Sequence, residues 1–338
     1  MDWGTTELKE RDNFLDCLRA IAAFLVLAVH AGLLLGGGIG VSIFFCLSGY
    51  LITTILLRID TSSPANIGRI IFRRFMRIWP MMFVQIVAVT ILTAIEAPEL
   101  LADYLRSVPG LLTFTSPANL SYQLSRSILW TLQAEFWFYV FLGVAFLIFG
   151  RRSLLAFAFV GITFAWGAKL GFVNLSVYLP MRATILYLDQ LMIGVVCAVA
   201  VQHDSKRLRR FLGSRSLFLW TPLALITVLS TLKFVGYDRP WFFSSSAAAY
   251  LTALMILHQW ARPLKGDYEP IATLGRISYS IYLMHGVVYD FVSWHIFPHA
   301  LQFLFHVGII ILISKVTYRW IELPFVRWSK MAPLKYPG

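Results

Sequence analysis

Apolar runs of roughly 20 residues recur along the whole chain, and short polar or charged segments separate them. A helix of about 20 apolar residues crosses the hydrocarbon core of a bilayer, which is roughly 30 Å thick. The pattern predicts an all-α, polytopic integral membrane helix bundle. We expect about ten transmembrane helices, over residues 15–35, 39–58, 80–96, 127–149, 153–170, 183–202, 216–235, 241–260, 277–297 and 299–320.

The basic residues between these runs predict the orientation of the helices. If the N-terminus is cytoplasmic, the inner segments carry 21 of the 29 Lys and Arg residues and the outer segments carry six, while Arg19 and Lys315 lie within spans. Cytoplasmic loops of membrane proteins are enriched in Lys and Arg. We therefore expect both termini inside the cell and a single transmembrane domain over residues 1–338, with short cytoplasmic tails at 1–14 and 321–338.

The composition supports the membrane interpretation. The chain is 58% hydrophobic and 14% charged, whereas soluble domains carry about 25% charged residues. Its net charge of +12 would favour nucleic-acid binding in a soluble protein, but here it follows from the basic cytoplasmic loops, so no nucleic acid is expected as a partner. The three cysteines, Cys17, Cys46 and Cys197, lie in or beside apolar runs, and their odd number argues against a disulfide framework.

The first apolar run carries two polar side chains, Arg19 near its start and His30 near its end. Eleven residues make almost three helical turns, so both lie on one face, roughly 16 Å apart along the axis. Polar residues inside a membrane helix usually face a cavity or a partner. Either this face looks into a polar interior, or the helix is an anchor whose arginine reaches the membrane surface.

A basic stripe precedes the third span. Arg69, Arg73 and Arg77 recur every four residues at the predicted cytoplasmic boundary, among aromatic residues that suit a membrane interface. The stripe binds either anionic lipid headgroups or a phosphorylated cytoplasmic ligand, because guanidinium groups match phosphate oxygens. Glu322, near the C-terminus, is a candidate partner for these arginines.

Three ionisable residues are predicted at a similar depth in the outer half of the membrane: His30, Glu135 and Asp189. Buried acids are unfavourable unless they are paired or hydrated, so a shared polar cavity would account for all three. A carboxylate beside a histidine fixes its tautomer and suits it to act as a general base on a hydroxyl. The alternative is a set of unrelated hydrogen bonds between helices.

Two further spans contain polar residues of interest. Ser48 and Gly49 in the second span allow close approach of another backbone, and helix packing is the commoner cause of such a pair than ligand binding. Tyr279, Tyr282 and His285 are spaced three apart in the ninth span. A lone histidine of this kind is more often a packed hydrogen-bonding residue than a catalyst. No metal-ligand spacing occurs, so no metal is expected.

Five of these segments together resemble the acyltransferase 3 family of membrane acyltransferases, and the resemblance covers nearly the whole chain. Each motif is weak alone, but their order along ten predicted spans is specific. The first motif is Arg19 and His30 with ten residues between them; the others are Phe44–Ile52, Arg73–Pro80, Trp130–Tyr139 and Ile277–His285. One departure is Thr131, which stands where a serine is expected.

The resemblance implies a multi-pass enzyme of the bacterial inner membrane. Such an enzyme takes an acyl group, commonly acetyl, from cytoplasmic acyl-CoA and places it on a sugar hydroxyl of a surface or exported polysaccharide or a glycolipid. Carried over to this chain, His30 would be catalytic with Arg19 as its essential partner, and Glu135 matches the glutamate of the fourth-span motif. Arg74 and Arg77 match an Arg-x-x-Arg element near the donor site.

The expected mechanism places acyl-CoA at the inner side and the sugar at the outer side. His30 would either deprotonate the acceptor hydroxyl or carry the acyl group itself. We expect Asp189 and Trp130 to contact the acceptor. The residues expected to bind acyl-CoA are Arg73, Arg74, Arg77, Tyr279 and Ser48.

Two other functions fit ten spans with buried ions. A transporter or flippase for a lipid-linked sugar or small molecule would move its substrate without incorporating acetate. A structural partner in a polysaccharide-export complex would show no turnover. Labelled acetyl-CoA offered to membranes separates these functions from acyl transfer.

Overall fold

The computed structural model describes residues 12–34, 38–59, 64–116, 128–173, 182–214, 220–221, 224, 240–263, 268–292, 299–331 and 334. All regular elements within these ranges are helical, as predicted. In chain order they are α1 Asn13–His30, α2 Ile39–Arg58, α3 Pro64–Glu96, α4 Pro98–Leu112, α6 Trp130–Phe149, η2 Arg151–Ser153, α7 Leu154–Lys169, α8 Arg182–Leu186, α9 Leu188–His203, α10 Lys206–Leu212, α12 Pro240–Ala261, α13 Glu269–Arg276, α14 Ser278–Phe291, α15 His299–Thr317, η3 Tyr318–Glu322 and α16 Leu323–Ser329.

Within the described ranges, five helical segments are long and apolar enough to cross a membrane: α1, α2, α3, α6 and residues 301–329, which combine α15, η3 and α16. Large apolar side chains remain exposed on their outer surfaces and on α7, for example Ile148 at 66% and Phe159 at 70%. Lipid is the environment that such a surface fits. The number of ten spans and the inward termini stay predictions, and the predicted span 216–235 lies almost wholly outside the described residues.

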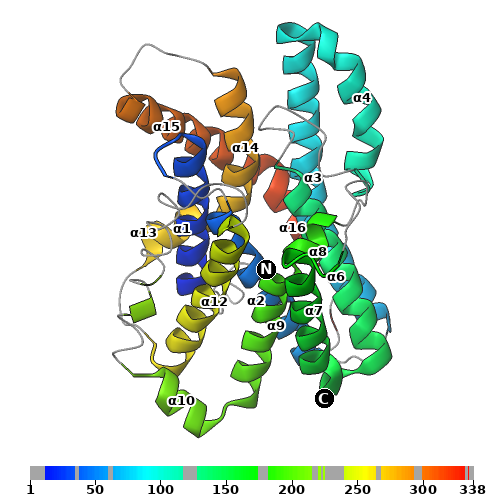
Figure 1. Ribbon diagram of the computed structural model, residues 1–338. Coiled ribbons are helices and arrows are strands. Elements are labelled where there is room, and N and C mark those ends of the chain that lie inside the picture. Colours follow the sequence, from blue (N-terminus) through cyan, green and yellow to red (C-terminus); the bar gives the residue numbers. More distant parts are fainter. Residues whose placement is uncertain are drawn as a thin grey trace.

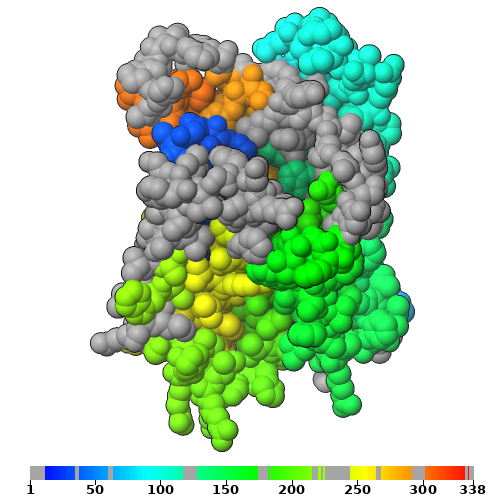
Figure 2. All heavy atoms as spheres, viewed as in Figure 1, coloured from blue at the N-terminus to red at the C-terminus, as the bar shows by residue number. Residues whose placement is uncertain are grey.

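The helix α2 lies at the centre of the bundle and packs against α1, α9 and α12, with further contacts to α6 (Figure 1). The α3–α4 hairpin, in cyan, projects beyond the neighbouring helices at one end of the molecule, and α10 lies at the opposite end (Figure 2). Residues 98–112, which lie between the predicted third and fourth spans, form α4.

The helix α3 begins 16 residues before the predicted third span, so that boundary was wrong. The basic stripe and the apolar span form one helix of 33 residues, and Pro80 lies inside it. Its length of about 50 Å, at about 1.5 Å per residue, exceeds the bilayer core. A proline lacks the N–H group that donates one helical hydrogen bond. Membrane helices tolerate a proline where neighbouring helices satisfy the backbone group that is left free. The stripe is therefore fixed rigidly to the membrane span.

Two glycines bring α2 and α9 into direct backbone contact. A Cβ atom added to Gly49 would lie 1.9 Å from the carbonyl oxygen of Leu191, and one added to Gly194 would lie 2.2 Å from that of Cys46. Only glycine fits such a crossing. Gly49 therefore marks close helix packing, as expected.

A buried ion pair joins α7, α9 and α12. Lys169, which the charge count assigned to an outer segment, is the last residue of α7, and its fully buried Nζ lies 2.6 Å from Asp189 Oδ1. Ser246 donates to Asp189 Oδ2 at 2.6 Å and Tyr250 at 3.3 Å, and Lys169 also donates to Ser246. A buried pair survives when further hydrogen bonds satisfy both ions, as they do here.

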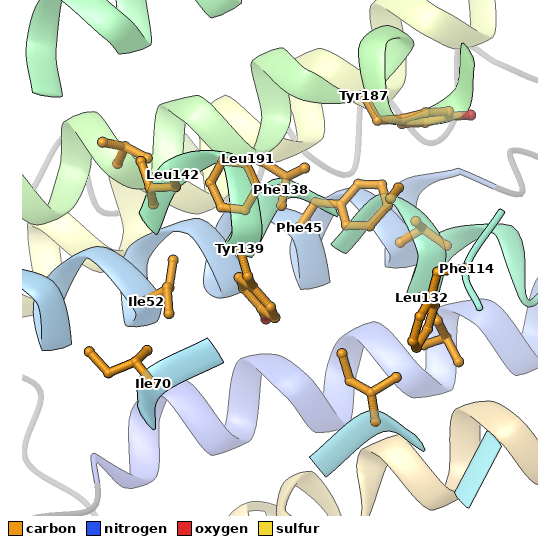
Figure 3. Packing of buried hydrophobic residues seen from close by; sticks show 14 of the residues in the cluster. Phe45, Ile52, Ile70, Phe114, Leu132, Phe138, Tyr139, Leu142, Tyr187 and Leu191 are labelled. Atoms are coloured by element: carbon orange, nitrogen blue, oxygen red, sulfur yellow. The ribbon is translucent and has the colours of Figure 1, made fainter. Parts of the chain in front are cut away.

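The largest apolar cluster fixes α6 against α2 and α9. Figure 3 shows Phe45, Phe138, Tyr139 and Leu191 gathered among these helices. The same cluster includes residues of α3 and α14, such as Met81 and Leu283. These five helices form the framework on which the polar residues of the interior are placed.

We predict that Gly194→Ala lowers the melting temperature of the detergent-solubilised protein, because the added methyl group overlaps α2; overpacking of this kind costs about 1–3 kcal/mol. Gly308→Ala in α15 is the matched control, since no atom lies within 4 Å of its added Cβ. It should leave the melting temperature unchanged or raise it, because alanine is the better helix former. Equal effects of the two substitutions would contradict the tight crossing.

For the buried pair, Lys169→Met alone should destabilise the fold by roughly 3–5 kcal/mol, because it leaves the Asp189 carboxylate without its counter-ion. The double variant Lys169→Met/Asp189→Asn should recover much of that loss, since no uncompensated charge remains. Thermal unfolding of the two variants beside the wild type measures both effects. A double variant as unstable as the single one would argue against the pair.

Candidate functional site

A cavity opens between α1, α2, α3, α6 and α14. Its apolar lining comes mainly from α2, with one residue each from α3 and α6. Its polar lining consists of Arg19, Ser48, Arg74, Arg77, Thr131, Glu135, Tyr139, Ser278, Tyr279 and Tyr282.

Glu135 organises one wall of the cavity. Its Oε1 accepts hydrogen bonds from the hydroxyl groups of Ser48 on α2 and Tyr139 on α6. Glu135 and Tyr139 are four residues apart and therefore share a face of α6. The guanidinium carbon of Arg74 lies 5.4 Å from the centre of the Tyr139 ring. Three helices are thus joined at one carboxylate.

Three arginines line the same cavity. Arg19 is 13% exposed and paired with the buried carboxylate of Asp16, three residues earlier on α1. Arg74 and Arg77 come from α3, and Arg77 interacts electrostatically with Glu322, in agreement with the expected pairing of that residue with the stripe. Arginine side chains concentrated in a cavity favour an anionic ligand with several oxygen atoms.

Two tyrosines of α14 complete the cavity. The Tyr279 hydroxyl donates to the carbonyl oxygen of Ile78 at 2.6 Å, next to Trp79 and Pro80 in α3. The Tyr282 hydroxyl lies 2.9 Å from that of Thr131, and the two share a hydrogen bond. The threonine found where the family motif has serine therefore keeps a hydroxyl partner for Tyr282.

His30 does not line this cavity but lies against His285 of α14. The two ring centroids are 5.2 Å apart and the planes are tilted by 33°. His285 is completely buried, whereas His30, in the last turn of α1, is exposed. Tyr282 connects the two features, because it lines the cavity and its ring centroid lies 5.5 Å from that of His285.

Sequence reasoning missed the pairing of the two histidines. The Tyr279, Tyr282 and His285 spacing was recognised, but His285 was interpreted as a packing residue. Its place beside His30 depends on how α14 is rotated against α1, which no local pattern encodes. The available signal was that both histidines terminate a motif of the same family.

The predicted cavity shared by His30, Glu135 and Asp189 is not formed. Glu135 bonds Ser48 and Tyr139, while Asp189 lies in the separate network with Lys169. Equal depth on three helices does not determine the face on which each side chain lies.

Two other candidate site residues lie outside the cavity lining. Arg73 Nη2 points to the carbonyl oxygen of Lys330 at 3.5 Å. The Trp130 ring packs 4.7 Å from that of Tyr187 and 6.0 Å from that of Phe45. The structure therefore brings Arg19, Ser48, Arg74, Arg77, Glu135 and Tyr279 together, and sets these two apart.

Comparison with known proteins finds one matching family model and several similar proteins. A family model described as an acyltransferase domain matches residues 12–319. O-acetyltransferase OatA of Staphylococcus aureus strain NCTC 8325 / PS 47 is 26% identical over 357 aligned positions, which cover 92% of this chain and 56% of OatA. OatA of strain COL matches to the same extent.

The chain thus spans 56% of the length of these curated relatives. No solved structure matches it. The matched region includes the cavity, both histidines and every helix that holds them. The chain belongs to the acyltransferase 3 family.

Proposed function

We propose that the protein is a membrane O-acyltransferase that moves an acyl group, most simply acetyl, from cytoplasmic acyl-CoA to a sugar hydroxyl. The acceptor would belong to a surface or exported polysaccharide or a glycolipid, and the enzyme would lie in the bacterial inner membrane. The family and relatives named O-acetyltransferases support acyl transfer to oxygen. The observation that carries the proposal further is the convergence of Arg19, Arg74 and Arg77 on one cavity.

The charge and the lining of the cavity support acyl-CoA as the donor. Acyl-CoA carries phosphate groups at one end, a flexible arm in the middle and the thioester at the other end. Arg74 and Arg77 would bind phosphate oxygens, since guanidinium groups form charge-assisted hydrogen bonds with them. The apolar lining, with Phe44 and Phe45 among its residues, would accept the arm.

Glu135 would act by holding the wall of this site. Its bonds to Ser48 and Tyr139 fix the phenol ring over which Arg74 lies. A carboxylate in this position also balances part of the charge of the three arginines. This role differs from the expected one, in which Glu135 oriented His30.

The chemical step would take place at His30. The imidazole accepts the proton of the acceptor hydroxyl while the hydroxyl oxygen attacks the thioester carbonyl carbon. The carbon–sulfur bond breaks, and the proton passes from the imidazolium to the departing CoA thiolate. The products are the ester and CoA, and His30 returns to its neutral form. Because His30 is exposed, an acceptor can reach it.

A transporter or flippase is the principal alternative. Purified protein in proteoliposomes, given acetyl-CoA labelled in the acetyl group and a glycan acceptor, distinguishes the two. Acyl transfer produces label on the glycan, whereas a transporter moves material across the membrane without covalent incorporation. Absence of incorporated label with a range of glycan acceptors would reject the proposal.

We predict that His30→Gln lowers kcat for acetyl transfer at least about 100-fold, the size of a general-base contribution, and leaves KM for acetyl-CoA within about twofold. His203→Gln is the matched control, because His203 is also exposed at the end of a helix but lies outside the site. A folded His30→Gln variant with full activity would exclude the scheme.

Arg74→Gln and Arg77→Gln should each raise KM for acetyl-CoA about tenfold or more, because each removes a charge-assisted hydrogen bond of about 1.5–3 kcal/mol. Arg210→Gln on α10 controls for loss of a basic residue elsewhere, and Arg73→Gln should have a smaller effect than either because Arg73 does not line the cavity. Initial rates measured at varied acetyl-CoA concentrations test this order of KM values. Equal KM values for all four variants would refute this donor site.

A further inference from the structure

The side chain of His285 has one satisfied and one unsatisfied ring nitrogen. Nδ1 forms a short hydrogen bond with the carbonyl oxygen of Tyr282, three residues earlier on α14. Nε2 is buried, and no hydrogen-bond partner for it occurs among the described residues. An unpaired buried polar atom is unfavourable by about 1–3 kcal/mol, so it calls for an explanation.

The hydrogen bond to Tyr282 determines the tautomer of His285. A carbonyl oxygen only accepts hydrogen bonds, so Nδ1 must carry the proton and donate it. In the neutral imidazole, Nε2 then has a lone pair and can only accept. The buried edge of His285 is therefore an acceptor without a donor.

The neighbour able to supply a donor is His30. Its ring centroid lies 5.2 Å from that of His285, a separation too short for another side chain to lie between them. His30 is exposed in the last turn of α1, so its ring can rotate without disturbing the core. Rotation of this ring can turn one of its N–H groups toward Nε2 of His285.

The two helices are held in place at this point. The Tyr289 hydroxyl on α14 donates to the carbonyl oxygen of Leu27 on α1 at 3.1 Å, one turn before His30. The Tyr289 ring also lies edge-on to His285 at 6.1 Å. The distance between the two histidines is thus set by the packing of α1 on α14.

We propose that His285 is the positioning residue of His30. This inference rests on the proposed function, in which His30 is the base. His285 Nε2 accepts the N–H of one His30 ring nitrogen, which leaves the other nitrogen unprotonated and directed at the acceptor hydroxyl. When that nitrogen takes the hydroxyl proton, the bond to His285 is retained, and it stabilises the imidazolium until the proton passes to CoA.

Other candidates for this role are weaker. Asp290 interacts electrostatically with His30, but it lies five residues beyond His285, past a full turn of α14. Glu135 is engaged by Ser48 and Tyr139. The Tyr289 hydroxyl already donates to Leu27. Asp290 is therefore the competitor that the experiment must include.

The test uses substitutions that separate the two ring nitrogens of His285. H285N keeps a donor at the position of Nδ1 for Tyr282 but has no atom at Nε2, and H285A serves as a second variant without the acceptor. H285Q places an amide oxygen near the position of Nε2, where it can accept from His30. D290N removes the charge of the competitor.

Two measurements are made on each purified variant. The first is kcat and KM for transfer from labelled acetyl-CoA. The second is the rate of carbethoxylation of His30 by diethylpyrocarbonate, followed by peptide mass spectrometry and divided by the rate at exposed His203 in the same sample. The second needs no substrate and reports the nucleophilicity of the unprotonated His30 nitrogen.

We expect H285N and H285A to lower kcat roughly tenfold to hundredfold, as loss of a partner that orients a histidine does elsewhere. KM for acetyl-CoA should stay within about twofold, and the His30/His203 rate ratio should fall severalfold. H285Q should retain most of the wild-type kcat and most of the His30/His203 rate ratio. D290N should resemble the wild type.

Unchanged kcat and rate ratio in folded H285N or H285A would overturn the inference, and so would a loss in D290N that is absent from H285N. A uniform loss in all variants, H285Q included, with a lowered melting temperature would indicate a merely structural residue and also overturn it. If the wild type transfers no acetyl group, the proposed function fails, while the rate ratio still decides whether His285 orients His30.

Discussion

A polar side chain inside an apolar helix bundle must find a partner, and this constraint explains the interior of the protein. Asp16 pairs with Arg19, Asp189 with Lys169, and Glu322 accepts from Ser280. Each pairing joins residues that would be unfavourable alone. Glu135 satisfies the same constraint with the hydroxyls of Ser48 and Tyr139, and in doing so forms a wall of the cavity.

The buried carboxylates differ in what surrounds them. Asp189 is enclosed completely by its partners and ties three helices together, so it serves the fold. Glu135 is partly exposed to the cavity, with arginines on the facing helices. The same chemical group therefore stabilises packing in one place and shapes a ligand site in the other.

The helix α14 connects the cavity with His30. Tyr279 and Tyr282 line the cavity, and His285, one turn further along, contacts His30. A thioester held beside Tyr282 would be one ring away from the histidine pair. Tyr279, Tyr282 and His285 thus form a series of side chains along α14 that runs from the cavity to His30.

The sequence by itself determined that the chain is helical and membrane-embedded, because the length of an apolar run indicates whether a helix can cross a lipid bilayer. It also located most helices closely, as for α2, and identified several of the residues that line the cavity, since family motifs retain those side chains. It misplaced the start of α3 at Pro80 and counted Lys169 with the outer segments, because charge suggested exposure where partners permit burial.

Only the tertiary structure decided which side chains meet. Depth along a span follows from counting residues, so His30, Glu135 and Asp189 were expected together. The rotation of each helix about its own axis depends on packing, such as the contact of Gly49 with Leu191, between residues far apart in the chain. That rotation separates the three residues and places His285 beside His30.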